Sequence, residues 1–234
     1  MLEESSWMDV ERYLQHDDRL VFVVGSCEQH GYLSLATDVK SPMAIAREVC
    51  RREGALLAPP IAYGVSPYFM AYPGTFSLRP ETLAAIMRDL VEQAIAHGFR
   101  RILVSNGHGG NTGIINPVLI EIGHAHPEAH LGLFHWWKHP AVIAAAQKDG
   151  YVQNHANWSE NFAFTRVGPV PTGVKETPTF PEAAAPAAMR RILGDGCFGG
   201  PYQAPQEVTD HLFAAAVEAM TAALRSLEAR PVRG

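Results

Sequence analysis

Two short apolar runs, each followed by a glycine-containing turn and then by a helical pattern, limit the folds open to this chain. The first run covers residues 21–24 and is closed by Gly25. The second covers residues 101–105 and leads through NGHGGNTG into an apolar helical stretch over residues 114–122. Apolar runs of this length that end in glycine are typical of buried strands. Strand, turn and helix in this order predict an α/β fold with a mostly parallel sheet flanked by helices.

Residue patterns elsewhere add further elements to this architecture. A third buried strand is expected over residues 130–137 and an extended segment over residues 56–63. Pro59 and Pro60 make that segment compatible only with a sheet edge or a bulge. Apolar spacings of three and four residues predict helices over residues 41–53, with Pro42 in the first turn, and over residues 80–96, 140–148, 182–193 and 209–229.

Length and composition favour a single domain over residues 1–234. The chain is 47% apolar, which is enough for a full core. Its 19 basic and 24 acidic residues give a net charge of −5 without a Lys/Arg-rich run, which argues against nucleic acid and membrane as partners and favours a small molecule. The acidic N-terminus has no signal-peptide core, and the three cysteines form no CxxC pair. We therefore expect a cytoplasmic protein.

Side chains of the metal-binding type follow both of the first two strands. Glu28 and His30 come just after residues 21–24, and residues two apart in an extended chain point to the same side. Asp38 follows a short loop, and His108 lies in the glycine turn after the second strand. Open α/β sheets place ligands at the carboxyl ends of their strands, where these side chains can meet. On Glu28, His30 and Asp38 alone, an ordinary surface loop remains an alternative.

The glycine turn itself admits a second interpretation, a phosphate-binding loop at a helix start. Its glycines at positions 107, 109 and 113 do not match GxGxxG, and no GK[ST] follows. The glycines are better explained as allowing a tight turn that points His108 outward.

A third candidate pair, His155 and Glu160, occurs in NHANWSENFAF. Five residues apart, the two side chains do not share one helix face. They can converge only if His155 is in a loop and Glu160 is on a new helix, with Asn157 or Ser159 near its N-cap. The alternative is that both residues merely cap this helix.

Two irregular segments are candidates for the walls of a site. Residues 63–76 (YGVSPYFMAYPGTF) combine glycine, proline and aromatic side chains, which suit a pocket wall or a purely structural loop. Residues 168–205 are rich in proline and glycine. They are expected to pack over the site, against another subunit, or as a plain surface excursion.

Taken together, the motifs GSCEQHG, ATD, SNGHGGN and HANWSEN resemble those of the creatininase (creatinine amidohydrolase) family in order and approximate spacing. The resemblance also takes in YGVSPYFMAYPGT and GCFGGPYQA and spans most of the chain. It implies a three-layer α/β fold with a mostly parallel central sheet. It also implies a homo-oligomer, a hexamer as in relatives.

The resemblance implies a site for two divalent metal ions. Glu28, Asp38 and His108 would hold one ion, and His30 with a bridging Asp38 would hold the second. Two histidines and three carboxylates form a mixed ligand set that suits Zn, Mn or Fe(II). Such an ion activates water at neutral pH, which hydrolysis of an unactivated amide requires.

Two further residues complete the implied site. The creatinine hydrolase of the family has a Glu two residues after the motif histidine, where this chain has Gly110. We therefore assign the remaining carboxylate to Glu160. His155 resembles the family histidine that handles protons beside the metals, and an acidic Glu160 is the other candidate to protonate the leaving nitrogen.

Departures from the family pattern fall where the family faces its substrate. The chain has HGYLSL in place of HGxHLPL and HANWSENF in place of HAGxxETS. Tyr68 and Phe69 stand where the family usually has Glu-His. The metal-type residues are kept, so we expect retained metal chemistry with altered substrate choice.

The sequence therefore predicts a metal-dependent amidohydrolase that cleaves a C–N bond of a small cyclic amide, formamide or similar metabolite. One alternative is a catalytically inactive metal-binding subunit that serves as a scaffold. Another is a peptide-trimming hydrolase, because the family includes such a branch. The sequence does not identify the substrate.

Overall fold

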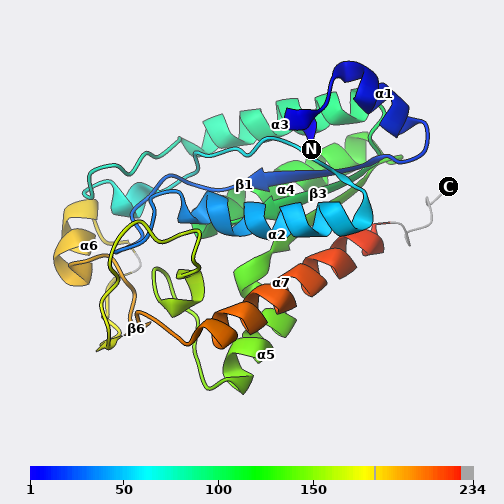
Figure 1. Cartoon of the computed structure of the whole chain (residues 1–234). Coiled ribbons are helices and arrows are strands. Elements are labelled where there is room, and N and C mark those ends of the chain that lie inside the picture. The colour runs from blue at the N-terminus through cyan, green and yellow to red at the C-terminus, as the bar shows by residue number, and fades with distance from the viewer. Residues whose placement is uncertain (182, 228–234) are drawn as a thin grey trace.

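The computed structural model describes residues 1–181 and 183–227, and Figure 1 shows its layers. In this part of the chain the main sheet has four parallel strands, in the order β2 (Leu56–Leu57), β1 (Arg19–Val24), β3 (Arg101–Asn106) and β4 (His130–His135). β1 and β3 pair along their whole length, from Arg19 opposite Arg101 to Val24 opposite Asn106. The predicted α/β class is confirmed.

Side chains of β1 divide between two cores, one on each face of the sheet. Val21 and Val23 pack into the core on one face, and Phe22 and Val24 pack into the core on the other. Because both faces are covered, the strand is apolar along its length instead of alternating. The covering helices are α2 (Thr37–Glu53), α5 (Pro140–Lys148) and α7 (Gln206–Ser226) on the first face, and α1 (Trp7–Leu14), α3 (Pro80–Ala96) and α4 (Thr112–Ala125) on the second (Figure 1).

α2 begins earlier than the sequence predicted, which places Asp38 in its first turn. The expectation that Pro42 lies in the first turn is wrong, because Pro42 is inside the helix. Proline has no N–H to donate to the carbonyl four residues earlier, which here is that of Asp38. A Cβ built on Gly25 or Gly107 would lie 2.5 or 1.9 Å from this carbonyl oxygen. Glycine at both strand ends is thus what lets the start of α2 approach the edge of the sheet.

Other elements match the predictions at their centres and differ at their ends. β2 stops at Leu57, and β2 is an edge strand, as the prolines after it require. Trp136 and Trp137, expected in a strand, form a 3-10 turn after β4 instead. α6 is Pro186–Leu193, and its expected start at residue 182 lies outside the described residues, as does the expected end of α7 at residue 229.

The sequence patterns missed α1 and a small antiparallel ribbon of β5 (Val174–Lys175) and β6 (Gly200–Pro201). Both are short, and the ribbon forms between segments 25 residues apart, so neither has a local signal of sufficient length. None of the helices in the described ranges is long and apolar enough to cross a membrane.

Candidate metal centre

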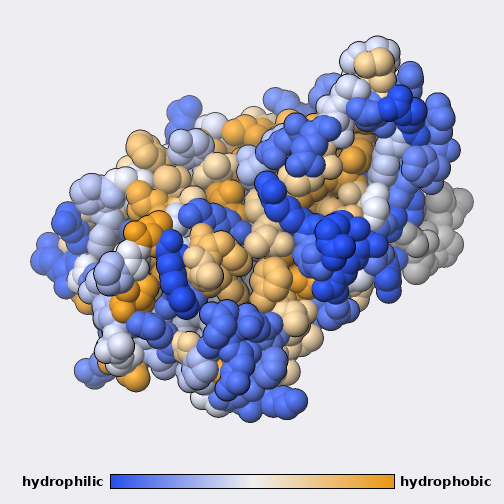
Figure 2. Space-filling model, in the orientation of Figure 1, coloured by the Kyte–Doolittle hydropathy of each residue, from blue (hydrophilic) through white to orange (hydrophobic). Residues whose placement is uncertain are grey.

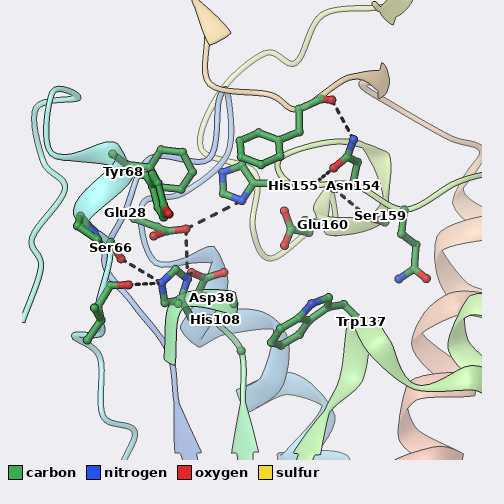
Figure 3. Close-up of a pocket in the computed structure, with 18 residues that line it drawn as sticks. Glu28, Asp38, Ser66, Tyr68, His108, Trp137, Asn154, His155, Ser159 and Glu160 are labelled. Atoms are coloured by element: carbon green, nitrogen blue, oxygen red, sulfur yellow. Dashed lines mark hydrogen bonds and ion pairs between the residues drawn. The ribbon is translucent and has the colours of Figure 1, made fainter. Parts of the chain in front are cut away.

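A cavity of about 580 Å³ opens at the carboxyl edge of the sheet, where β1 and β3 end. Figure 3 shows the side chains that line it. Glu28 follows β1, His108 follows β3, and Asp38 comes from the start of α2, so three separate segments meet here. The opposite wall is formed by residues 65–69, 153–155 and 159–160 and by Phe198. Residues 63–76 thus contribute a pocket wall, one of the two alternatives that their composition left open.

One group of possible metal ligands consists of Glu28, Asp38 and His108. The Nδ1 atom of His108 lies 2.9 Å from Asp38 Oδ2 and 3.3 Å from Glu28 Oε1. Ligand atoms that share one ion at about 2.1 Å lie about 3 to 3.5 Å apart. The spacing of this group therefore fits a single cation between the three side chains.

A second group consists of His30, Asp38 and Glu160. The Nε2 atom of His30 lies 3.0 Å from Asp38 Oδ1 and 3.8 Å from Glu160 Oε2. Asp38 turns one carboxylate oxygen to each group, which is the geometry that a bridging carboxylate requires. Glu160 joins the group of His30 and is in the one-turn 3-10 helix Trp158–Glu160, whose N-cap is Asn157.

The other ring nitrogens of both histidines face backbone carbonyls. His30 Nδ1 lies 3.1 Å from the oxygen of Glu28, and His108 Nε2 lies 2.9 Å from the oxygen of Val65. A carbonyl can only accept, so each ring carries its proton there and leaves the nitrogen in the cluster unprotonated when neutral.

When both rings are neutral and carry their protons on the carbonyl side, three buried polar atoms of the cluster have no hydrogen-bond donor or acceptor among the described residues: Glu28 Oε2, His30 Nε2 and Asp38 Oδ2. Buried polar groups in folded proteins are satisfied in the great majority of cases, and three exceptions in one place point to a ligand. Two of these atoms are carboxylate oxygens and one is the unprotonated nitrogen of an imidazole, so all three are electron-pair donors of the kind that bind a cation. The residues present therefore fit a metal site.

Burial and proximity shift the pKa values of these groups in different directions. Burial disfavours the charged form of His30, but Asp38 and Glu160 outweigh burial and raise the pKa of His30 to about 10. Burial raises the pKa of Glu160 to about 7. Burial and the nearby charge of His30 hold the pKa of His155 well below its usual value. The protonation of each of these carboxylates and histidines thus depends on the charges of its neighbours. This is expected at a cation site, because a metal ion displaces protons from its ligands when it binds.

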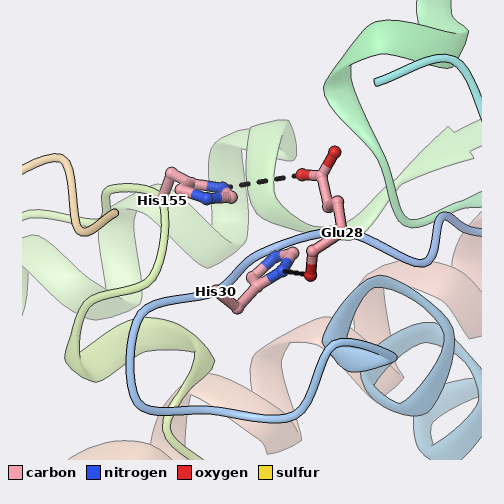
Figure 4. A group of neighbouring side chains, drawn as sticks. All are labelled: Glu28, His30 and His155. Carbon is pink, nitrogen blue, oxygen red and sulfur yellow. Dashed lines mark hydrogen bonds and ion pairs between the residues drawn. The ribbon is translucent and has the colours of Figure 1, made fainter. Parts of the chain in front are cut away.

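His155 is in a loop, as its convergence with Glu160 requires, and lies beside Glu28 and His30 (Figure 4). Its Nδ1 atom lies 3.9 Å from Glu28 Oε1. Its Nε2 atom lies 2.9 Å from Gln29 Nε2 and 3.2 Å from the backbone oxygen of Gln29. Gln29 thus contacts one ring nitrogen of His155, Nε2, while the other, Nδ1, faces the carboxylate of Glu28. With Glu28 and His30, His155 also forms a third possible ligand group.

Comparison with known proteins agrees with this picture. The family model described as creatinine amidohydrolase matches residues 3–224. The chain belongs to the creatininase family. The creatininase-type resemblance and the layered α/β fold predicted from the sequence are thereby confirmed.

Individual creatininase relatives differ in their reported activity. The creatinine amidohydrolase of Pseudomonas putida is 31% identical over 164 residues, which cover 64% of this chain and 63% of that protein. A mycofactocin precursor peptide peptidase of Mycobacterium ulcerans is 38% identical over 102 residues, 39% of this chain and 40% of that protein. Each alignment therefore spans less than two thirds of the relative's length.

Solved creatininase structures share the fold over nearly the whole chain. A structure described as creatininase Mn has a TM-score of 0.81 at 26% identity and covers 98% of both chains. A creatininase point mutant described as Zn-Zn type gives a TM-score of 0.80 at 25% identity with the same coverage. Relatives with this fold thus bind Mn or Zn.

The structure leaves no room for a side chain at Gly110. A Cβ at this position would lie 2.1 Å from the oxygen of Val65 and 2.6 Å from His108 Nε2. The backbone of residues 63–76 occupies the space that a side chain at position 110 would need. Glu160, to which the sequence analysis assigned the remaining carboxylate, groups with His30 and Asp38.

Gln29 and Phe198 belong to the site but were not identified from the sequence, whereas Phe69 was. Gln29 engages His155, and the rings of Phe69 and Phe198 pack on His155 at 4.9 and 4.8 Å between ring centroids. Gln29 stands inside GSCEQHG, between two predicted ligands, which was a usable signal. Phe198 comes from residues 168–205, so this segment does reach the site, the first of the three alternatives left open for it.

Proposed function

We propose that this chain is a metal-dependent amidohydrolase that cleaves a C–N amide bond of a small molecule with an activated water. The observation that carries the proposal is the pair of buried ligand groups that share Asp38 and face an open cavity. Membership of a hydrolase family supports the same reaction class.

In this proposal Glu28, Asp38 and His108 hold one divalent ion, and His30, Asp38 and Glu160 hold a second. Zn, Mn or Fe(II) suits a set of imidazole and carboxylate ligands. A divalent ion held there supplies Lewis acidity, which lowers the pKa of water from 15.7 toward about 7 and polarises a carbonyl oxygen.

Side chains near the proposed ions would transfer protons and hold the proton-transferring group in place. His155 is neutral at pH 7, because its pKa is held low, so it can accept a proton at Nδ1 and later deliver it to the leaving nitrogen. Gln29 holds Nε2, so that only Nδ1 exchanges protons with the cavity. The ring of Phe69 stacks on the imidazole of His155, and the ring of Phe198 packs against it. Together they fix the plane of the imidazole and cover part of its surface. Glu160, held by the backbone N–H of Ala156 at 2.6 Å, is the second acid–base candidate.

A peptide substrate is the second candidate, because the mycofactocin precursor peptide peptidase is 38% identical over the aligned part. The scaffold alternative predicts the same metal ligands without turnover. A hydrolysis screen separates the three possibilities.

The test uses protein stripped of metal with a chelator and reloaded with Zn or Mn. Cyclic amides, formamides and short peptides are then assayed for release of an amine or a carboxylate. The proposal expects hydrolysis of a small amide that is lost on stripping and restored on reloading. Hydrolysis confined to peptides would favour the peptidase, and binding of metal without any turnover would favour the scaffold.

We also propose a homo-oligomer, a hexamer as in relatives. Large apolar side chains are exposed in several segments, among them Trp7, Phe76 and Val174 at 72%, 58% and 73%. Figure 2 shows hydrophobic patches between hydrophilic ones on one face of the molecule. Exposed apolar area of this kind is commonly covered by another subunit. Sedimentation of the protein at micromolar concentration tests this, and a monomer would contradict it.

A further inference from the structure

Two buried asparagines bracket the turn that carries His108. Asn106 is the last residue of β3 and Asn111 is the N-cap of α4, and both residues are 0% exposed. Their side chains bond to each other, because Asn111 Nδ2 donates to Asn106 Oδ1 at 3.3 Å. A buried carboxamide that leaves its hydrogen bonds unmade costs free energy, so the further partners of these two amides show what the pair holds in place.

Asn106 holds the backbone of His108 on both sides. Its Oδ1 accepts from the backbone N–H of His108 at 3.1 Å, and its Nδ2 donates to the backbone oxygen of His108 at 2.7 Å. Nδ2 also lies 3.2 Å from His135 Nδ1. Burial and the charge of Lys138 lower the pKa of His135 to about 4, so this ring is neutral at pH 7 and can accept there. Both N–H groups of the Asn106 amide are thus used.

Asn111 holds the same histidine from the side of its ring. Its Oδ1 accepts from the backbone N–H of Val65 at 3.0 Å, and the carbonyl of Val65 accepts from His108 Nε2 at 2.9 Å. Its Nδ2 also donates to the oxygen of Gly25, just after β1, at 3.1 Å. Asn111 therefore ties together the end of β1, the turn after β3 and the loop of residues 63–76.

The space around the Asn111 amide is tightly filled. A Cβ built on Gly64 would lie 2.6 Å from Asn111 Oδ1 and 2.5 Å from the oxygen of Gly25. A side chain at position 64 would therefore displace the amide or the end of β1. Residues that fix a metal ligand in this way raise the affinity for the ion, because an ion that binds a loose ligand must also order it.

We propose that Asn106 and Asn111 are positioning residues that set the affinity for the ion held by His108. His108 belongs to only one of the two proposed ligand groups. The affinity for the ion held by His30 should therefore not depend on the two asparagines. This inference rests on the proposed two-ion site and deepens it, because it gives one ion a support that the other lacks.

The test measures each ion by itself, by competition for Zn with a chromophoric chelator. The background Glu160→Gln leaves the ion of His108, and the background Glu28→Gln leaves the ion of His30. We expect Asn106→Ala to weaken binding of the ion of His108 by about 10- to 100-fold, the usual effect of losing a residue that orients a metal ligand. The same substitution should change the affinity for the ion of His30 by less than about 2-fold, as expected for independent sites.

Asn111→Ala is the second variant, and it carries the prediction if Asn106→Ala does not fold. It removes the contact that fixes Val65, whose carbonyl holds the ring of His108. Binding of the ion of His108 should again weaken by about 10- to 100-fold, and the ion of His30 should again be unaffected.

Asn161→Ala is the matched control in the Glu160→Gln background. Asn161 is also buried, at 1% exposed, but its amide donates to the oxygen of Tyr202 at 2.9 Å and accepts from Arg166 Nε at 2.6 Å. All three alanine variants should melt about 2 to 12 °C below their parent without metal, because each loses buried hydrogen bonds. Asn161→Ala should nevertheless keep the affinity of its parent for the ion of His108.

An equal loss of both ions would assign the asparagines a purely structural role and overturn the inference, as would unchanged binding of the ion of His108 in a folded Asn106→Ala or Asn111→Ala variant. Wild-type protein that binds no ion would overturn both the inference and the proposed function. Hydrolysis is followed in wild type and in each asparagine variant made alone. Two bound ions without turnover would contradict only the proposed function, whereas turnover with unchanged metal affinity in the variants would contradict only the positioning role.

Discussion

Gly110→Ala tests how tightly the turn after β3 packs against residues 63–76. The new Cβ would lie 2.1 Å from the Val65 oxygen, and side-chain carbons do not normally approach closer than 3.0 Å. Val65 or the turn must therefore move by about 1 Å, and overpacking of this kind costs about 1 to 3 kcal/mol. The same oxygen holds His108 Nε2 at 2.9 Å, a contact worth about 1 kcal/mol.

We therefore expect Gly110→Ala to lower the free energy of unfolding by about 2 to 4 kcal/mol. In a protein of this length that corresponds to a fall of about 4 to 16 °C in the melting temperature. Because His108 loses its anchor, metal affinity should also fall, by about 10- to 100-fold. Thermal melts with and without Zn, together with a metal competition assay, measure both effects.

The matched control is Gly113→Ala, in the first turn of α4. A Cβ there meets no heavy atom within 4 Å, so the variant should gain about 0.5 kcal/mol from the higher helix propensity of alanine. If Gly110→Ala is as stable as Gly113→Ala and binds metal as well as wild type, the described packing of this turn is wrong.

Three further substitutions have expected outcomes. Glu160→Gln should weaken the ion held by His30 and Asp38 while the other ion stays bound, which metal titration can resolve; equal loss of both ions would contradict two separate groups. His155→Ala should leave both ions bound and slow turnover by about 10²- to 10⁴-fold, and wild-type turnover would refute its acid–base role. Asp17→Asn removes a carboxylate that lies 2.6 Å from Arg19 Nη2 and 3.1 Å from Arg101 Nη2, and should cost about 1 to 2 kcal/mol at pH 7. Burial raises the pKa of Asp17, but the hydrogen bonds from Arg19 and the charges of Arg19 and Arg101 together outweigh burial, so the folded pKa is below 3.8. The carboxylate therefore stabilises the fold above pH 4, and the difference between variant and wild type should vanish as the pH falls through the folded pKa; a constant difference from pH 7 to pH 2 would contradict this.

The candidate ligands could be found from the sequence because they lie next to strands with strong local signals. Glu28 and His30 follow an apolar run, and His108 lies in a glycine turn between a strand and a helix. Parallel strands end at a common edge, so naming the strands was enough to bring these residues together. Asp38 was also predicted to be a ligand, but its position in the first turn of α2 was not predicted.

Contacts that depend on long-range folding could not be predicted in the same way. Phe198 reaches the cavity only because residues 168–205 fold back over it, and their glycines and prolines carry no periodic signal. The early start of α2 depended on close contacts of Gly25 and Gly107 with the Asp38 carbonyl, which are tertiary contacts as well.

The most direct test of the central claim is the metal content of wild type and of Asp38→Asn, measured by elemental analysis after loading with Zn. If Asp38 bridges the two ligand groups, wild type should carry two ions per chain and Asp38→Asn should lose both, while Asp17→Asn should bind as wild type does. Asp38→Asn with the full metal content of wild type would contradict the account.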